Sequence, residues 1–171
     1  MILIVIITRN IMVSNNWVCY ILLSLDSNKT YVGATDCLYR RLSDHNGLNG
    51  KSKGAKATKG EQWIPVLFVS GFNNKIGCLS FESGVRRIVR RKCSKKYKFN
   101  YKSDNVHKRI VSIYNLLYAG SPLNKWTSNG LQLNWLEKKY HIPSLILPDK
   151  CKECLEFNKL QFNDEKHIEF T

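Results

Sequence analysis

The chain has 171 residues, 43% of them hydrophobic, which is enough for one folded domain with a core and excludes a disordered chain. Lysine and arginine outnumber aspartate and glutamate by 27 to 13, so the net charge of +14 favours a polyanionic partner, with nucleic acid ahead of a merely solvated basic surface. The apolar run over residues 2–7 is far shorter than the roughly 20 residues of a membrane span and lacks signal-peptide features. We therefore expect an intracellular protein that is not secreted and binds no membrane. The run itself is either an extra edge strand or a segment before a working start at Met12.

The first predicted elements are two strands, over residues 17–25 and 30–33. The first is apolar on both faces, as an inner strand is, and residues 26–29 supply turn residues between the two. We expect the strands to pair as a hairpin. Such a hairpin brings Tyr20 and Tyr31 into one small sheet, near the point where the next element begins.

A helix is predicted after the second strand, because Leu38 and Leu42 lie four residues apart. Arg41 and His45 have the same spacing and therefore share a face of that helix. Two cationic or near-cationic groups side by side repel each other. We therefore expect an anion, such as a phosphate, between them.

The next segments are a glycine- and lysine-rich loop over residues 46–60, a third strand over 63–71 and a helix from Ser80 onwards. The loop is either an ordinary solvated connection or a track for a phosphate backbone, since close approach needs glycine and neutralisation needs lysine. In the predicted helix Glu82 stands in the first turn. That carboxylate either complements the helix dipole or binds a metal ion such as Mg²⁺. The arginines that follow it form a basic face, which is either solvated or attracts nucleic acid.

The C-terminal part begins with a basic linker over residues 95–102. A strongly apolar helix is predicted from Val106 to Gly120 and a shorter one over 131–140, and we expect both to serve packing rather than chemistry. The predicted division is an N-terminal extension (1–16), a main domain (17–94), and a linker with a helical segment that packs on it (95–171).

Six cysteines are spread through the chain without a secreted context, so reduced thiols are expected. Cys151 and Cys154 alone have the spacing of metal ligands. A structural zinc site would need two further ligands, and His141 and His167 form no recognised pattern with them. We expect no structural zinc.

The ordered series Cys19-Tyr20-Ile21, Tyr31-Val32-Gly33, Arg41, His45 and Glu82 resembles the GIY-YIG nuclease superfamily. Four local strings are similar to its Slx1 branch of structure-specific endonucleases: residues 40–47, 54–58, 69–72 and 79–82. The resemblance covers residues 17–90, and more faintly the helices after residue 106. It implies an α+β fold: a small mixed or antiparallel three-stranded sheet flanked by helices and followed by a helical segment.

The chain departs from the Slx1 pattern at three places. Val18-Cys19-Tyr20 replaces Gly-Ile-Tyr, which keeps the tyrosine, and Ser43 stands where relatives often have an arginine. The RING-type zinc domain of Slx1 is missing from the sequence. In Slx1 that domain engages the Slx4 scaffold, so dependence on an Slx4-type partner is in question here.

The resemblance implies metal-assisted hydrolysis of DNA near branch points, such as Holliday junctions, flaps and forks, in repair, recombination or replication. It implies that Glu82 binds the divalent ion, Mg²⁺ or Mn²⁺, that Arg41 neutralises the phosphate, and that Tyr20 deprotonates or orients the attacking water. Tyr31 and His45 would complete the hydrogen-bond network. The implied catalytic residues are thus Tyr20, Tyr31, Arg41, His45 and Glu82, and the candidate DNA contacts are Arg40, Lys51, Lys53, Lys56, Lys59, Arg86, Arg87 and Arg90.

Two alternatives stay open from the sequence: a branched-DNA-binding protein without turnover, and a site-specific nuclease of the homing or restriction type. The second would need a sequence-reading module, and the C-terminal part shows no recognition helix or zinc finger. The expected partner is branched double-stranded DNA, and a homodimer would suit the two cuts that a four-way junction needs. The abundance of Asn, Lys and Ile suggests an AT-rich genome, such as that of a large DNA virus, and work where that genome replicates, in nucleus or cytoplasm.

Overall fold

The computed structural model describes residues 17–48, 55–90, 104–118, 125–155, 160–163 and 167–170. Strands β1 (Val18–Ser24) and β2 (Thr30–Thr35) form the first hairpin and lead into helix α2 (Leu38–His45). A 3-10 helix (Lys56–Thr58) and strand β3 (Trp63–Ser70) follow, and then helices α3 (Lys75–Arg90) and α4 (Asn105–Tyr118). The last elements are β4 (Gln132–Trp135), a 3-10 helix (Lys138–Tyr140), β5 (Lys152–Cys154), and a separate hairpin of β6 (Leu160–Asn163) and β7 (His167–Phe170).

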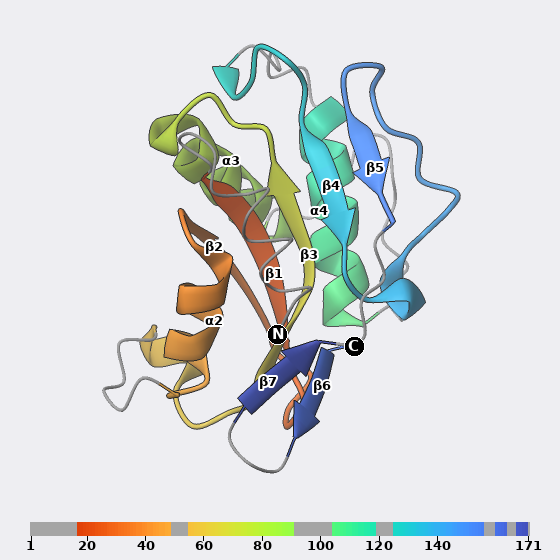
Figure 1. Cartoon of the computed structure of the whole chain (residues 1–171). Helices are drawn as coiled ribbons and strands as arrows, with labels where there is room; N and C mark the ends of the chain where they lie inside the picture. Colours follow the sequence, from red (N-terminus) through yellow and green to blue (C-terminus); the bar gives the residue numbers. More distant parts are fainter. Residues whose placement is uncertain are drawn as a thin grey trace.

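One mixed sheet of five strands organises the molecule, in the order β2-β1-β3-β4-β5 (Figure 1). β4 and β5 are parallel, and the other neighbours are antiparallel. This confirms the α+β class, and the three predicted strands form β2, β1 and β3. The sheet is wider than the three strands expected, because β4 pairs with β3 and β5 extends it further. Pro65 fits inside β3 because the pairing with β4 begins only at Leu67 and the register with β1 shifts opposite Pro65.

Each face of the sheet has its own hydrophobic cluster. Cys19, Ile21 and Leu23 of β1 point to the face that α3 and α4 cover, where they pack with apolar side chains of both helices. The alternate residues of β1 join Leu42 of α2 on the other face, as the period of two in a strand requires. The second cluster contains Val18, Tyr20, Leu22, Leu42, Trp63, Phe68 and Leu136. Tyr20 is therefore held on the α2 face by a packed core.

Two predicted elements are wrong in type or extent. The helix expected over residues 131–140 is strand β4 followed by the 3-10 helix, and Leu131, Leu133 and Trp135 are buried on alternate positions. The second helix begins at Lys75 rather than at Ser80, since the Asn74 side chain accepts a hydrogen bond from the Gly77 amide (2.9 Å) and caps it.

In the part of the chain that the structure describes, no helix is long and apolar enough to cross a membrane. The predictions for residues 1–16, for Lys51 and Lys53, and for the linker over 95–102 lie outside the described residues.

Candidate active site

Four of the predicted site residues meet at the junction of β1, β2 and α2. The Tyr20 hydroxyl lies 2.9 Å from Nε2 of His45, and the Arg41 guanidinium hydrogen-bonds the hydroxyl groups of both Tyr20 and Tyr31. The Tyr31 and His45 rings lie 4.8 Å apart between centroids. The expectation of an anion between Arg41 and His45 is thus corrected. The Tyr20 hydroxyl lies between the two side chains, where it accepts a hydrogen bond from Arg41 and contacts His45.

A threonine from the loop before β3 completes the group. Nδ1 of His45 lies 2.8 Å from Oγ1 of Thr58, whose hydroxyl donates to the Ala55 carbonyl (2.9 Å). A carbonyl oxygen only accepts hydrogen bonds, so the single proton of the threonine hydroxyl is used there and Nδ1–H of His45 donates to Oγ1. Nε2 is then the unprotonated nitrogen, and the Tyr20 hydroxyl donates to it. Sequence reasoning picked out the string that contains Thr58 but singled out only Lys56 in it, as a candidate DNA contact.

The electrostatics of the group agree with this assignment of protons. Burial, helped by the positive charge of Arg41, lowers the pKa of His45 to about 4, so the imidazole is neutral near pH 7. Burial also raises the pKa of Tyr20 well above its usual value, although the hydrogen bond from Arg41 acts in the opposite direction. Tyr20 therefore keeps its proton in this structure and is able to donate it to His45.

Exposure divides the group into two halves. Tyr20 and His45 are buried, with 1% and 3% of their surface exposed, whereas Tyr31 and Arg41 are partly exposed. Tyr31 and Arg41 are therefore the members of the group that are most accessible to a substrate. The role of Tyr20 toward the attacking water stays a prediction.

Gly33 makes this packing possible. It pairs with Tyr20 across the β1–β2 ladder, and a β-carbon at residue 33 would lie 2.6 Å from Cζ of Tyr20 and 2.8 Å from Cε1 of Tyr31. No real β-carbon makes contacts so short. The glycine of the Tyr31-Val32-Gly33 sequence is thus required by the close approach of two tyrosine rings.

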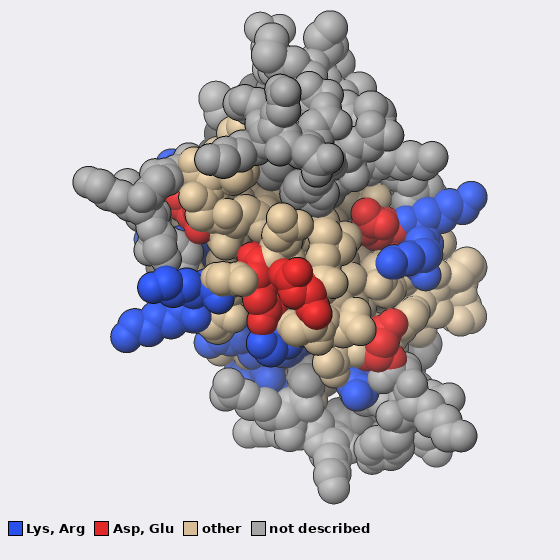
Figure 2. Space-filling view, turned by 90° about the horizontal axis from the view of Figure 1, so that it is seen from below, with Lys and Arg blue, Asp and Glu red and all other residues tan. Residues whose placement is uncertain are grey.

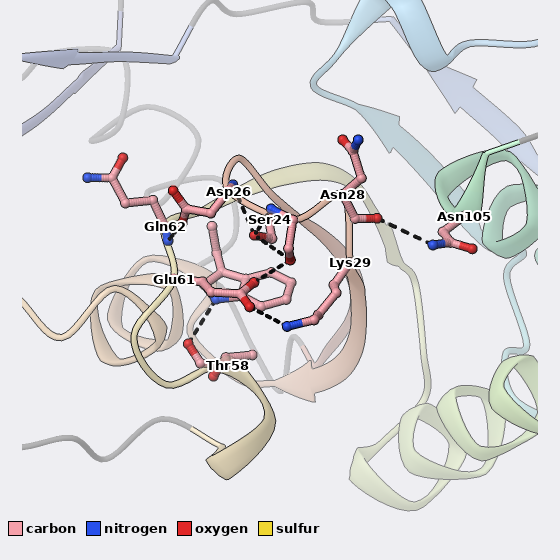
Figure 3. Close-up of polar contacts among 10 residues, drawn as sticks. Ser24, Asp26, Asn28, Lys29, Thr58, Glu61, Gln62 and Asn105 are labelled. Atoms are coloured by element: carbon pink, nitrogen blue, oxygen red, sulfur yellow. Dashed lines mark hydrogen bonds and ion pairs between the residues drawn. The ribbon is translucent and has the colours of Figure 1, made fainter.

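The loop that carries Thr58 is fixed to the rest of the domain at several points. Trp63 donates from its indole Nε1 to the Thr58 carbonyl (2.9 Å). The Asn46 side chain donates a hydrogen bond to the Trp63 carbonyl and accepts one from the Trp63 amide. Glu61 accepts from Lys29 (2.5 Å) and Ser27 (2.7 Å) of the β1–β2 turn, contacts that lower its pKa to about 2 (Figure 3). These contacts hold the Thr58 hydroxyl in place under His45.

Glu82 lies apart from the four joined residues, on α3, which packs on the other face of the sheet. Its carboxylate forms an ion pair with Arg86 (3.1 Å), and burial raises its pKa although Arg86 opposes that rise. Because α3 begins at Lys75, Glu82 stands about two turns inside the helix, and a role as a first-turn partner of the dipole is excluded.

The donor chemistry at Glu82 is compatible with a divalent ion. Its side chain is only 13% exposed, so a bound cation would offset the desolvation that now raises its pKa. The described residues contain no cluster of three or more His, Cys, Asp or Glu side chains that could hold a metal. Mg²⁺ is commonly held by one or two carboxylates together with waters and substrate phosphates, so a single protein ligand fits that ion better than zinc.

Comparison with known protein families identifies the chain. Residues 16–98 match the model of the GIY-YIG catalytic domain. The chain contains a GIY-YIG catalytic domain. It therefore carries a DNA endonuclease domain, and all five predicted catalytic residues lie inside the matched region. GIY-YIG nucleases generally use a divalent metal, in agreement with the carboxylate chemistry at Glu82.

Three relatives show how far the similarity extends. The uncharacterized protein L300 of Acanthamoeba polyphaga mimivirus is 43% identical over 120 residues, which cover 63% of this chain and 72% of L300. The structure-specific endonuclease subunit slx1 of Xenopus laevis is 33% identical over 132 residues, 70% of this chain and 42% of the relative. The slx1 subunit of Aspergillus terreus is 41% identical over 66 residues, 37% of this chain and 17% of the relative. The chain thus spans less than half of the length of either slx1 protein.

The predicted DNA contacts of the GIY-YIG domain fall into three groups. Arg40 forms an ion pair with Asp36, which lies just before α2 (2.6 Å), and Arg86 forms one with Glu82 on α3. Lys56, Lys59 and Arg87 are exposed. Lys51 and Lys53 lie outside the described residues, as does the Arg90 side chain.

The surface near the site is not uniformly basic. A hollow of about 500 Å³ on the far side of His45 is lined by Asp26, Asp44 and Glu61, and by Lys59. Figure 2 shows acidic side chains gathered in the middle of the lower face, with basic side chains to both sides. Carboxylates in that hollow repel a phosphate backbone, and one of them, Asp44, also forms an ion pair with Arg41 (4.0 Å).

Proposed function

We propose that this chain is a structure-specific DNA endonuclease that hydrolyses phosphodiester bonds near branch points such as four-way junctions, flaps and forks. The observation that carries the proposal is the joining of Tyr20, Tyr31, Arg41 and His45 into one hydrogen-bonded group inside the GIY-YIG domain. The slx1 relatives are structure-specific endonuclease subunits, which supports a branched substrate.

The partly exposed half of the group would meet the substrate. Arg41 is a permanent cation with several donors, so it can pair with a non-bridging oxygen of the scissile phosphate as negative charge grows there. Tyr31, held by Arg41, would orient the attacking water through its hydroxyl. Both are catalytic residues in this proposal.

The buried half would position Arg41. The Tyr20 oxygen accepts from Arg41 while its proton points to His45, so the neutral imidazole increases the acceptor strength of the phenol. Thr58 fixes the imidazole in the tautomer that this needs. Tyr20, His45 and Thr58 are positioning residues, and they act through Arg41.

Glu82 would hold the divalent ion, which we propose is Mg²⁺. When bound, the ion supplies Lewis-acid stabilisation of the charge that develops on the phosphate. The chain contributes the Glu82 carboxylate, which is mostly shielded from water and is paired with Arg86.

The test is a cleavage assay on end-labelled four-way junction, flap, fork and linear duplex DNA of matched sequence, with Mg²⁺ or with EDTA. We expect Mg²⁺-dependent incision near the branch, and loss of at least 100-fold in rate for Glu82→Gln and for Arg41→Ala. Glu137→Gln is the matched control, because Glu137 is another partly buried glutamate whose pKa burial raises, and it lies outside the matched domain.

Incision of linear duplex at one sequence would replace the branch-directed assignment with a site-specific one. Binding of the junction without incision under any metal would overturn the enzymatic proposal in favour of a DNA-binding protein. Full activity of Glu82→Gln would remove Glu82 from the site.

A further inference from the structure

A second hollow, of about 340 Å³, opens beside the candidate active site between the β1–β2 turn and α4. Its walls come from three parts of the chain. They are Lys29, Thr30 and Tyr31 at the start of β2, Ala57 and Trp63 from the segment leading into β3, and Asn105, Lys108 and Arg109 of α4. We call this hollow the α4 groove.

The α4 groove is basic. Lys29, Lys108 and Arg109 line it, of which Lys29 is paired with Glu61, and none of its described lining residues is an aspartate or glutamate. This is the opposite of the hollow on the far side of His45, which three acids line. Asn105 and Thr30 add polar side chains of the kind that contact phosphate oxygens.

Two contacts fix the helix wall against the turn. Arg109 donates from Nε to the Thr30 hydroxyl (3.3 Å), and the Asn105 side-chain amide donates to the Asn28 carbonyl (3.4 Å; Figure 3). The Arg109 side chain is therefore held next to β2 rather than extended into solvent. A groove that is already formed loses less conformational entropy when a ligand binds.

The α4 groove is continuous with the candidate active site through Tyr31. This residue lines the groove, and its hydroxyl accepts a hydrogen bond from Arg41. A strand that places one phosphate at Arg41 therefore has the groove beside it. The groove has two aromatic residues. Trp63 is 1% exposed and cannot stack on a base, and Tyr31 is only partly exposed and held by Arg41 through its hydroxyl, which favours the sugar–phosphate backbone as the occupant.

We propose that the α4 groove binds the DNA backbone next to the phosphate that is cut, so that α4 belongs to the DNA-binding surface. The inference rests on the proposed function and extends it, because Asn105, Lys108 and Arg109 lie beyond residues 16–98 of the GIY-YIG match. Contacts to phosphate carry no base sequence, which suits an enzyme that recognises DNA shape.

The test measures binding rather than cleavage. Fluorescein-labelled four-way junction DNA is titrated in EDTA by fluorescence anisotropy, at several salt concentrations, with the full chain, Lys108→Ala and Lys150→Ala. Lys150 is an exposed lysine at the end of the sheet opposite the β1–β2 turn, since Ser70, Gln132 and Lys152 pair there. Thermal melting checks that both variants fold.

We expect Lys108→Ala to raise Kd about 3- to 10-fold near 0.1 M salt and to reduce the slope of log K against log salt by about 0.9, the value for one lost phosphate contact. Lys150→Ala should match the unchanged chain. If Lys108→Ala and Lys150→Ala have the same Kd and the same slope of log K against log salt, the groove proposal is overturned. It is also overturned if the wild-type chain binds no DNA.

Cleavage assays on the same proteins separate the two proposals. In single-turnover cleavage, Lys108→Ala should need about 3- to 10-fold more DNA to reach half of its maximal rate, because the groove contributes to binding, and Lys150→Ala should match the unchanged chain. If Lys108→Ala changes the salt slope but the unchanged chain never cuts DNA, the groove proposal stands and the endonuclease proposal is overturned. If the unchanged chain cuts DNA but Lys108→Ala leaves the salt slope unchanged, the endonuclease proposal stands and the groove proposal is overturned.

Discussion

The hydroxyl of Tyr20 donates a hydrogen bond to Nε2 of His45 across 2.9 Å, and it joins the central part of β1 to the last residue of α2. The same hydroxyl accepts from Arg41, so one phenol connects the neutral imidazole to the permanent cation. This relationship places the determinants of Arg41 geometry inside the core, out of contact with any substrate. Changes to residues that never touch DNA should therefore alter the rate of cleavage.

Thr58 gives the most direct test of that idea. Replacing it with valine keeps the shape and removes the acceptor for Nδ1–H of His45, so the imidazole loses its preferred tautomer. We expect kcat to fall about tenfold or more with little change in the KM for DNA, and the free energy of unfolding to fall by about 1–3 kcal/mol because a buried donor is left unpaired. The tautomer itself is read from the ¹⁵N chemical shifts of His45.

Two further variants separate positioning from simple loss of stability. Thr58→Ser keeps the hydroxyl and should restore both the ¹⁵N signature and the rate. Thr127→Val removes another buried threonine hydroxyl that donates to a carbonyl, that of Gly130 (3.0 Å), and should cost stability without slowing cleavage. Equal rates for Thr58→Val and Thr127→Val would show that Thr58 has only a structural role.

The pKa of His45 predicts a dependence of stability on pH. It is about 4 in the folded chain and near 6.5 when unfolded, so the unfolded state binds the extra proton first as pH falls. The free energy of unfolding should therefore be unaffected by His45 above about pH 7.5 and should decrease by about 2 kcal/mol between there and pH 4.5. Urea unfolding at a series of pH values measures this decrease in the free energy of unfolding.

The comparison that isolates His45 is the difference between the wild-type chain and His45→Gln at each pH. Glutamine cannot titrate, so the free energy of unfolding of His45→Gln should fall by about 2 kcal/mol less in acid than that of the wild-type chain. The carboxylates contribute equally to both chains. Parallel curves from pH 7.5 to 4.5 would mean that His45 is not buried as a neutral group.

Local patterns were sufficient to predict the hairpin, α2, the strand that became β3 and the grouping of the site residues. They failed where packing over a distance decides. Arg41 and His45 could be placed on one helix face from their spacing, but no local signal shows that Tyr20 inserts between them from β1. The same is true of Thr58, whose partner lies 13 residues earlier in the chain.

The segment over residues 131–140 is different, because its signal was present in the sequence. Leu131, Leu133 and Trp135 alternate with exposed or partly exposed Gln132 and Asn134, which is the period of a strand. The adjacent Leu136 and the later Tyr140 also satisfy a helical spacing, so this short segment was compatible with either a strand or a helix. Pairing with β3 decides for the strand.

Gly33 provides a last prediction, because the fit of two tyrosines depends on the absence of its β-carbon. In Gly33→Ala the new methyl group would meet the rings of Tyr20 and Tyr31 inside normal contact distance, and the Tyr20 ring has no room to retreat within its core cluster. We expect cleavage to fall by at least 100-fold, because the two tyrosine hydroxyls that contact Arg41 are displaced, and stability to fall by about 1–3 kcal/mol from overpacking. Single-turnover cleavage and urea unfolding measure the two effects.

Gly47→Ala is the matched control for this variant. Gly47 follows α2 with φ of +69°, and a β-carbon there meets nothing within 4 Å. Alanine at that position should cost about 1–2 kcal/mol through backbone strain alone and leave the tyrosines where they are. If both variants lose similar stability, only Gly33→Ala should lose activity. A Gly33→Ala chain that cuts at the wild-type rate would show that the tyrosine pair can shift without consequence, and the positioning of Arg41 by Tyr20 would have to be abandoned.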